Sequence, residues 1–375
     1  MSEKKRIMSV FGTRPEAIKM APLVQALHGH PQIESLVCVT GQHRDMLDQV
    51  LTIFSITPDI DLNIMRFNQD LTSITTRTLE GLAPVLAEYQ PDLILVHGDT
   101  TTSVSAALAA FYQKIPVAHV EAGLRSQDPY SPFPEEMNRC LISRLARLHF
   151  APTESNANNL RQEHIQGLIE VTGNTVIDAL LSMVYDAYTF QHPLLSDFNF
   201  AAGPAILLTA HRRENFGQPI YNICQAVRRL LQDHPSLRVI YPVHPNPQIQ
   251  EPVRDYLEGV QRLNLIAPLD VQEMHNLMAR CTFVMTDSGG LQEEAPALGK
   301  PVLVLRTETE RPEAVAAGTV EVAGVEEEKI YQSAHALLTD PQKFDRMAMA
   351  VNPYGDGHAC ERIVACIEKW AGIRT

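Results

Sequence analysis

The sequence predicts two doubly wound α/β domains of the Rossmann-like type with a cleft between them. Short apolar runs rich in β-branched residues alternate with amphipathic segments of helix length along most of the 375 residues. Continuous apolar strands that alternate with helices are typical of parallel sheets covered on both faces. Because the series runs to about ten strands and the chain exceeds the usual size of one domain, two domains fit better than one.

The candidate strands fall into two groups of similar size. In the first half of the chain they are residues 7–11, 36–40, 93–97, 117–120 and 148–151. In the second half they are residues 206–209, 237–243, 263–267, 283–286 and 302–305. Residues 100–111, 134–148 and 359–370 have the pattern of helices, and a further helix is expected to begin about Val176.

Two segments are candidates for the domain boundary. We expect it at the turn Val171-Thr172-Gly173-Asn174, which places residues 1–173 in the first domain and residues 174–356 in the second. The other candidate, residues 189–204, is rich in Phe, Pro, Asp and Gly. We interpret it as a loop inside the second domain.

Composition excludes several classes of protein. The formal net charge of −13 argues against a protein that wraps nucleic acid, although a phosphate site needs only local positive charge. The six cysteines are scattered without a CxxC pair, as expected of reduced thiols in a core. The apolar run after Arg6 is too short for a signal sequence, and no stretch has the length of a membrane span. We therefore expect a cytoplasmic protein that makes no membrane contact.

Unusual polar residues follow the candidate strands almost without exception. In open α/β sheets, ligands bind beyond the carboxyl ends of the strands. These segments therefore predict one cleft to which both domains contribute. They are residues 12–16, 98–100 and 121–125 in the first half and residues 211–215, 244–246 and 287–290 in the second.

The turn after the first strand combines a helix start with a possible anion site. Thr13 and Glu16 form the pattern of a capping box, with Pro15 in the first turn. The same turn offers backbone N–H groups and the Arg14 guanidinium, where a phosphate could sit. Lys19 lies on the next turn and reads either as a ligand group or as a solvated lysine.

The segment 287–294, Asp-Ser-Gly-Gly-Leu-Gln-Glu-Glu, is the most informative in the chain. Gly289 and Gly290 let the backbone approach a ligand, and the helix dipole favours a diphosphate there. Glu294 could accept hydrogen bonds from both ribose hydroxyls, whereas the alternative is a Ser288 cap with glycines for packing. The GxGxxG and Walker A patterns are absent, so neither NAD nor ATP is indicated.

Several carboxylates and histidines are candidates for acid–base chemistry. Asp99 reads as a helix cap or a catalytic acid, and Glu121 has less structural reason to stand at a strand end. Glu135 and Glu136 open a helix, where acids also suit the dipole. The histidines His211 and His244 also follow strands. No ligand spacing typical of a metal site is present among these residues, and the DxD motif of one class of glycosyltransferases is missing.

With these residues assembled, the sequence resembles the non-hydrolysing UDP-N-acetylglucosamine 2-epimerases, a bacterial family with the two-domain fold of GT-B glycosyltransferases. The matching segments span most of the chain and occur in family order. They are residues 10–19, 96–100, 119–125, 132–139, 211–215, 287–296 and 306–313.

The resemblance implies roles for individual residues. The catalytic candidates become Asp99, Glu121, Glu135 and His211, with Arg14 and Lys19 at the reaction site. UDP is expected on the second domain, and its binding residues would be Arg14, His211, Ser288, Gly289, Gly290 and Glu294. Many bacterial members bind a second UDP-N-acetylglucosamine as an activator, and the residues matching that site are Gln42, Glu136, Arg212 and His244. The segment Arg66-Phe67-Asn68-Gln69 departs from the basic pattern of some members there.

The resemblance also implies a homodimer without cofactor or metal. Residues 357–375 would return to pack on the first domain. The reaction would be the reversible epimerisation of UDP-N-acetylglucosamine at C2, by elimination of UDP to a glucal and re-addition, in service of cell-envelope polysaccharide biosynthesis. Such a reaction needs proton transfer on both faces of C2, for which several carboxylates are suitable. The alternatives are a GT-B glycosyltransferase, a hydrolysing relative that releases N-acetylmannosamine, and a non-catalytic UDP-sugar sensor.

Overall fold

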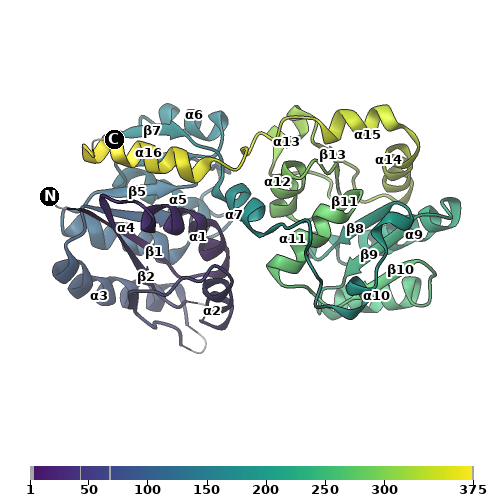
Figure 1. The fold of residues 1–375 in the computed structure, drawn as a ribbon, viewed down its shortest axis with the longest axis horizontal. Helices are drawn as coiled ribbons and strands as arrows, with labels where there is room; N and C mark the ends of the chain where they lie inside the picture. Colours follow the sequence, from purple (N-terminus) through teal and green to yellow (C-terminus); the bar gives the residue numbers. More distant parts are fainter. Residues whose placement is uncertain (1–3, 43, 67–68, 374–375) are drawn as a thin grey trace. The chain divides into compact units, whose positions relative to one another are not determined.

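The chain forms two α/β units in a computed structural model that describes residues 4–42, 44–66 and 69–373 (Figure 1). Unit 1 consists of Met1–Ser182 together with Tyr354–Thr375, and unit 2 of Met183–Pro353. Each unit has its own parallel sheet with helices between the strands. The prediction of two doubly wound parallel sheets is confirmed.

Within the described residues, unit 1 has a 7-stranded sheet in the order β3-β2-β1-β4-β5-β6-β7. Its strands are β1 (Lys5–Phe11), β2 (Ile33–Val39), β3 (Ile60–Asp61), β4 (Leu93–His97), β5 (Val117–Val120), β6 (Leu148–Ala151) and β7 (Leu168–Val171). Its helices are α1 (Arg14–His28), α2 (Arg44–Ile53), α3 (Leu71–Tyr89), α4 (Thr101–Tyr112), α5 (Glu135–Leu145), α6 (Glu154–Gln162), α7 (Thr175–Met183) and α16 (Ala359–Ala371).

Both faces of this sheet are buried, which explains why its strands are apolar without alternation. Met8 and Val10 of β1 point into a core shared with α3, α4 and α5. Ile7 and Phe11, at odd positions of the same strand, are equally buried. α1 packs along β1 and β2 and also against α16. Helices therefore sandwich the sheet.

Unit 2 has, among the described residues, a 6-stranded sheet in the order β10-β9-β8-β11-β12-β13. Its strands are β8 (Ala205–Thr209), β9 (Arg238–Pro242), β10 (Leu263–Ile266), β11 (Phe283–Thr286), β12 (Val302–Val304) and β13 (Val320–Val322). Its helices are α8 (Pro193–Ser196), η1 (Phe200–Ala202), η2 (Arg213–Asn215), α9 (Gln218–Asp233), α10 (Pro247–Leu257), α11 (Val271–Arg280), α12 (Gly289–Ala297), α13 (Pro312–Ala317), α14 (Glu327–Thr339) and α15 (Pro341–Ala348).

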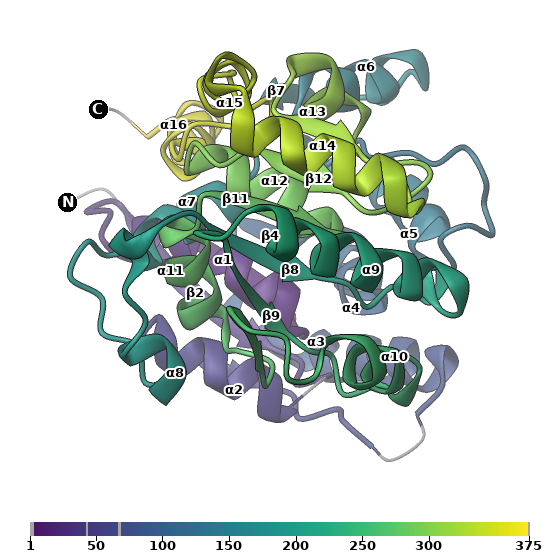
Figure 2. The ribbon, with the colours of Figure 1, turned by 90° about the vertical axis from the view of Figure 1, so that its right-hand side faces the viewer.

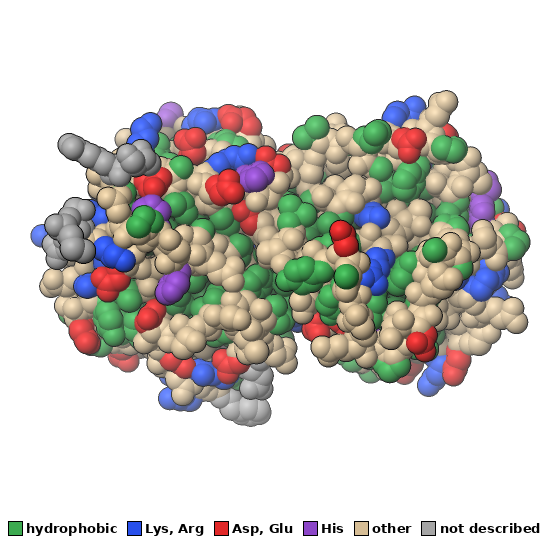
Figure 3. Space-filling model, viewed as in Figure 1, with side chains coloured by type: hydrophobic (Ala, Val, Ile, Leu, Met, Phe, Trp, Pro, Cys, Tyr) green, Lys and Arg blue, Asp and Glu red, His purple; other side chains and the backbone are tan. Residues whose placement is uncertain are grey.

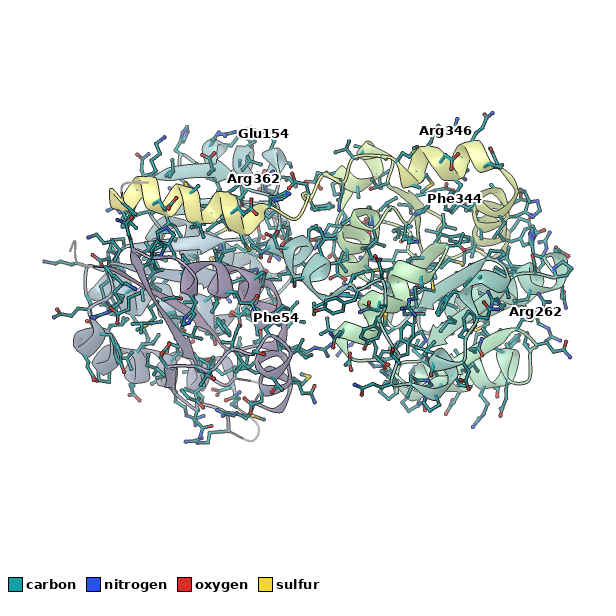
Figure 4. The ribbon with its side chains drawn as sticks, in the orientation of Figure 1. Phe54, Glu154, Arg262, Phe344, Arg346 and Arg362 are labelled. Atoms are coloured by element: carbon teal, nitrogen blue, oxygen red, sulfur yellow. The ribbon has the colours of Figure 1, made fainter. Side chains whose placement is uncertain are left out.

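The core of unit 2 lies between its sheet and the row α10, α9 and α14, which Figure 2 shows in front of the strands. Ile223, Val227 and Leu230 of α9 meet β8 and β9 there. Phe344 of α15, labelled in Figure 4, packs against the same core. The surface drawn in Figure 3 carries acidic and basic side chains interspersed.

The observed bounds of the units differ from the expected division after residues 173 and 356. α7 is part of unit 1, because Asp178 on α7 accepts hydrogen bonds from the backbone N–H groups of Ala359 and Cys360 at the start of α16. Arg362 of α16, labelled in Figure 4, also donates to the carbonyl of Thr172. Residues 189–204 lie inside unit 2 and contain α8 and η1.

The expected strands are all present, within a few residues of their predicted bounds. The structure adds β3, β7 and β13, which occupy sheet edges and were not predicted. In the part of the chain that the structure describes, no helix combines the length and the apolar character needed to cross a membrane.

Candidate active site

Several of the candidate residues lie where the strand order reverses in each sheet. In unit 1 this switch point lies between β1 and β4, and in unit 2 between β8 and β11. Connections that leave such a point on opposite faces open a crevice beyond the carboxyl ends of the two strands. The predicted phosphate turns and several of the predicted acids stand at these two positions.

The turn from β1 to α1 requires glycine at residue 12. A Cβ there would lie 1.9 Å from Thr40 Oγ1 and 2.9 Å from Thr102 Oγ1. The Thr102 hydroxyl in turn donates to Gln42 Oε1 at 2.9 Å. The end of β1 therefore packs closely against Thr40 and Thr102. Arg14, the first residue of α1, is partly exposed.

Lys19 and Glu121 form an ion pair at the carboxyl edge of unit 1. Lys19 Nζ lies 2.6 Å from Glu121 Oε1, and the two side chains are 20% and 13% exposed. The same oxygen accepts from Asn174 Nδ2 at 2.9 Å. Glu121 has a φ of 63°, a left-handed conformation that costs a non-glycine residue of order 1 kcal/mol. Such strain is typical of residues held in place for function.

Asp99, at the end of β4, is paired with Arg139 of α5. Arg139 Nε and one terminal nitrogen lie 2.8 and 2.6 Å from Asp99 Oδ2. Asn138 Nδ2 donates to the Asp99 carbonyl at 2.8 Å. Asp99 is therefore not the cap of α4, because the N-cap is Thr100.

α5 also supplies the neighbouring pair Glu135 and Glu136, which differ in environment. Glu136 is 3% exposed, and its carboxylate accepts from the N–H groups of Ser126 and Gln127 and from Arg139. Glu135 Oε2 is buried and has no hydrogen-bond partner among the described residues. Among the described residues, the Glu136 carboxylate is therefore committed to protein donors, whereas one oxygen of Glu135 is not.

Three histidines lie on neighbouring strands beneath these acids. His97 is the last residue of β4, and His119 lies on β5. His149 lies on β6 and is the register partner of His119. Burial lowers the pKa of His97 to about 4, that of His119 to about 3 and that of His149 to about 4. His97 Nε2 lies 3.3 Å from Glu121 Oε2 without the alignment of a hydrogen bond. All three rings are neutral at pH 7.

In unit 2, the buried Asp287 holds the turn that carries His211. Asp287 is 0% exposed, and its Oδ2 accepts from the N–H groups of His211 and Arg212 at 2.7 and 2.8 Å and from Asn215 Nδ2 at 2.9 Å. His211 Nδ1 lies 3.2 Å from Asp287 Oδ1. Burial lowers the pKa of His211, and Asp287 opposes that shift. The His211 ring stacks on His244, with centroids 5.7 Å apart.

The N-terminus of α12 is flanked by two guanidinium groups. Ser288 is the N-cap, followed by Gly289 and Gly290. A Cβ built on Gly289 would lie 3.7 Å from a terminal nitrogen of Arg212 and 3.8 Å from one of Arg311. Helix dipole, exposed N–H groups and two cations favour an anion at this point. Arg311 is held by Glu293 of α12.

Glu294 is oriented by a histidine of α11. His275 Nε2 lies 3.2 Å from Glu294 Oε2, and the two side chains are 3% and 13% exposed. A Cβ on Gly290 would lie 3.4 Å from Glu294 Oε1, so the carboxylate reaches back to the helix start. This places an acceptor beside the anion site.

Sequence reasoning located these groups but missed most of their partners. Arg139, Asn174, His275 and Arg311 were not singled out, because no local pattern shows which distant side chain an acid will meet. Phe67 and Asn68, part of the departure at the expected activator site, lie outside the described residues. Within the described part of the chain, no group of three or more His, Cys, Asp or Glu side chains is arranged to hold a metal ion.

A family model and individual relatives match this chain under the same description. The family model described as UDP-N-acetylglucosamine 2-epimerase matches residues 25–368. A UDP-N-acetylglucosamine 2-epimerase of Salmonella typhimurium is 53% identical over 371 residues, covering 97% of this chain and 99% of that protein.

Solved structures agree with the sequence comparison. The crystal structure of a UDP-N-acetylglucosamine 2-epimerase matches with a TM-score of 0.92 and 51% identity, covering 100% of this chain and 98% of the other. The UDP-GlcNAc 2-epimerase of Neisseria meningitidis, solved bound to UDP-GlcNAc, matches with a TM-score of 0.86 and 50% identity, covering 97% and 100%.

Proposed function

The chain belongs to the UDP-N-acetylglucosamine 2-epimerase family, and on that premise we propose that it interconverts UDP-N-acetylglucosamine and UDP-N-acetylmannosamine. The relatives named above carry that activity in their names, and the Neisseria protein was solved with UDP-GlcNAc. The observation in this molecule that carries the proposal is the anion site at the start of α12 in unit 2; unit 1, taken by itself, has several acids close to the ends of its strands.

UDP binds unit 2 in this proposal. Its diphosphate lies at Ser288, Gly289 and Gly290, where the α12 dipole meets Arg212 and Arg311. The carboxylate of Glu294, held by His275, accepts from the ribose hydroxyls. His211 and Arg14 are the further residues assigned to the phosphates.

The reaction proceeds by elimination and re-addition. A base removes the proton at C2 while the C1–O bond breaks, which leaves UDP and a 2-acetamidoglucal. UDP then adds back to C1, and a proton is delivered to the opposite face of C2. Asp99, Glu121 and Glu135 are the candidates for these transfers, because two faces of one carbon need two groups. The balance is complete, since the proton removed from C2 is replaced by one from an enzyme acid.

The cationic side chains stabilise the negative charges that are present or develop during the reaction. Lys19 holds the Glu121 carboxylate at 2.6 Å and balances its charge. Arg14 and His211 stabilise the diphosphate as it departs, when negative charge grows on its oxygen. No step of the proposed reaction requires redox chemistry, so the proposal includes no nicotinamide cofactor.

Proton NMR of the enzyme with UDP-N-acetylglucosamine in deuterated water tests the proposal. The product should be UDP-N-acetylmannosamine with deuterium at C2, and long incubation should label the substrate as well. Epimerised product that keeps protium at C2 would exclude elimination and re-addition. Release of free N-acetylmannosamine would instead identify a hydrolysing enzyme, and transfer to an added acceptor a glycosyltransferase. Binding without any turnover would identify a sensor.

We also propose activation by substrate and assembly as a homodimer. The residues assigned to a second UDP-N-acetylglucosamine are Gln42, Arg212, His244 and Glu136. The Glu136 carboxylate already accepts hydrogen bonds from Ser126, Gln127 and Arg139.

The dimer interface is assigned to α4 and α5, which pack together and leave several apolar side chains exposed. These are Phe111 (55%), Tyr112 (69%), Met137 (43%) and Leu141 (48%).

A further inference from the structure

Glu16 has a set of contacts that a helix cap does not require. Its Oε2 accepts from the backbone N–H groups of Gly12 and Thr13 at 3.0 and 2.8 Å and lies 2.8 Å from Thr13 Oγ1. This half of the carboxylate closes the turn between β1 and α1. It is the reciprocal contact of a capping box, in which the third helical residue reaches back to the cap.

The other oxygen of Glu16 serves a different turn. Oε1 lies 2.6 Å from Thr100 Oγ1 and 2.8 Å from Ser103 Oγ, residues 84 and 87 positions away in the chain. Thr100 caps α4 and directly follows Asp99. A capping box accounts for none of these long-range contacts. Each oxygen of one carboxylate therefore holds one of the two turns that leave the switch point of unit 1.

Unit 2 has a related arrangement at its own switch point, in which one carboxylate oxygen holds the neighbouring turn. There the buried carboxylate is Asp287, which follows β11 and accepts from the N–H groups of His211 and Arg212 after β8. Both carboxylates are buried, Glu16 at 2% and Asp287 at 0% exposure, so neither can contact a substrate directly. The residues that Glu16 holds lie next to the candidates Asp99 and Arg14, and Asp287 holds the backbone of His211, itself a candidate.

We propose that Glu16 is a positioning residue for the reaction, fixing Asp99 on one turn relative to Arg14 and Lys19 on the other. The inference rests on the proposed function, because it assigns Glu16 a place in that chemistry. Asp99 lies in the turn before α4, and the cations of α1 follow the turn before that helix. The Glu16 carboxylate joins these two turns. A misplacement of about 1 Å between such groups can lower a rate by about 10²-fold.

Three variants and one control separate this role from simple stability. Glu16→Ala removes both arms of the bridge. Ser103→Ala weakens the arm to α4 and also removes the contact of the same hydroxyl with the His97 carbonyl. Glu16→Gln keeps the bridge, because its oxygen can accept from the two N–H groups while its amide donates to the hydroxyls, which can rotate to accept. The control is Asp92→Ala. Asp92 joins the same strands at their opposite ends, accepting from the N–H of Arg6 and from Lys5 Nζ.

The measurement is kcat, KM and the UDP dissociation constant for each folded variant, with melting temperatures by circular dichroism. We expect kcat to fall about 10²-fold in Glu16→Ala and less in Ser103→Ala. Glu16→Gln should stay within about tenfold of the parent. UDP affinity should change little in any variant, because all of the assigned UDP contacts except Arg14 lie on unit 2. Asp92→Ala should lower the melting temperature and leave kcat at the parental value.

Two results would overturn the inference while the parent enzyme remains an active epimerase. The first is a Glu16→Ala kcat equal to that of Asp92→Ala, which would make Glu16 purely structural. The second is Glu16→Gln as slow as Glu16→Ala, which would assign the effect to charge rather than to the bridge. If Glu16→Ala does not fold, the double variant Thr100→Ala, Ser103→Ala decides. It removes both hydroxyls of the arm to α4, so a parental kcat in it contradicts the bridge. A parent without epimerase activity would instead refute the proposed function.

Discussion

The ammonium of Lys19, one turn into α1, lies 2.6 Å from Glu121 Oε1 at the end of β5, and Asn174 donates to the same oxygen. The carboxylate is therefore fixed from two sides, while its second oxygen faces the ring of the neutral His97. A base that must take a proton from a carbon benefits from being held in one orientation.

Replacing Glu121 by glutamine should slow epimerisation by about 10²–10⁴-fold, since the amide cannot take up or release the proton. Lys19→Met should also slow it, because the carboxylate loses its counter-ion. Initial rates and deuterium uptake at C2 measure both effects. Glu80→Gln, on the exposed side of α3, is the control and should keep the parental rate. A parental rate of C2 exchange in Glu121→Gln would remove this residue from the chemistry.

Glu294→Ala should weaken UDP binding by about ten- to a hundredfold, the equivalent of one charged hydrogen bond at about 1.5–3 kcal/mol. His275→Ala should weaken it less, because it frees the carboxylate without removing it. Calorimetry with UDP and with 2′-deoxy-UDP measures the effect, and both variants should lose preference for the ribose form. Glu251→Ala, exposed on α10, serves as the control. An unchanged dissociation constant in Glu294→Ala would return Glu294 to a structural role.

Substrate activation predicts a sigmoidal dependence of rate on UDP-N-acetylglucosamine, and a reverse reaction that needs a trace of that sugar nucleotide to start. His244→Ala and Gln42→Ala should flatten the curve toward a hyperbola. Glu136→Gln should chiefly lower the melting temperature, because its carboxylate accepts from two backbone N–H groups and Arg139. Hyperbolic kinetics of the parent in both directions would argue against a second site.

A homodimer through α4 and α5 predicts that Leu141→Arg, which places a charge among exposed apolar side chains, yields a monomer. Light scattering after gel filtration gives the mass. Met349→Arg is the matched control, because Met349 is 84% exposed but lies on unit 2. A parent that elutes as a monomer, or a dimeric Leu141→Arg, would place the interface elsewhere or remove it.

The buried histidines predict a loss of stability in mild acid. Burial lowers the pKa of His97, His119 and His149 to about 4, 3 and 4, below the unfolded value, so the unfolded chain binds the extra protons. Their contribution to stability is present above about pH 6.5 and is lost as the pH falls toward 4. At pH 5 each histidine favours unfolding by about 2 kcal/mol.

Urea unfolding of the parent between pH 7.5 and pH 5 measures this slope. His149→Gln should reduce the number of protons taken up on unfolding by about one. His28→Gln, an exposed position on α1, should leave the slope as it is. Equal free energies of unfolding at both pH values would show that these rings are protonated in the folded protein.

The sequence was sufficient for the fold because its buried strands carry continuous apolar runs. β7, with the sequence LIEV, is largely exposed at a sheet edge, and β3 and β13 are two and three residues long. Such edges carry little apolar signal, so they were missed. Asp99 and Glu121 could be named as candidates because they follow strands, and Glu135 because it opens a helix. Their partners could not, since Arg139 meets Asp99 and His275 meets Glu294 only once the sheets have formed.

The return of the chain to unit 1 has a consequence for synthesis on the ribosome. Asp178 of α7 has its hydrogen-bond donors in Ala359 and Cys360, up to 182 residues later, and His30 pairs with Glu368. All residues of unit 2 are therefore synthesised before α16, the helix that completes unit 1. Domains generally fold as units during translation. The surface of unit 1 that α16 will cover therefore stays open to chaperones until residues 359–371 have left the ribosome.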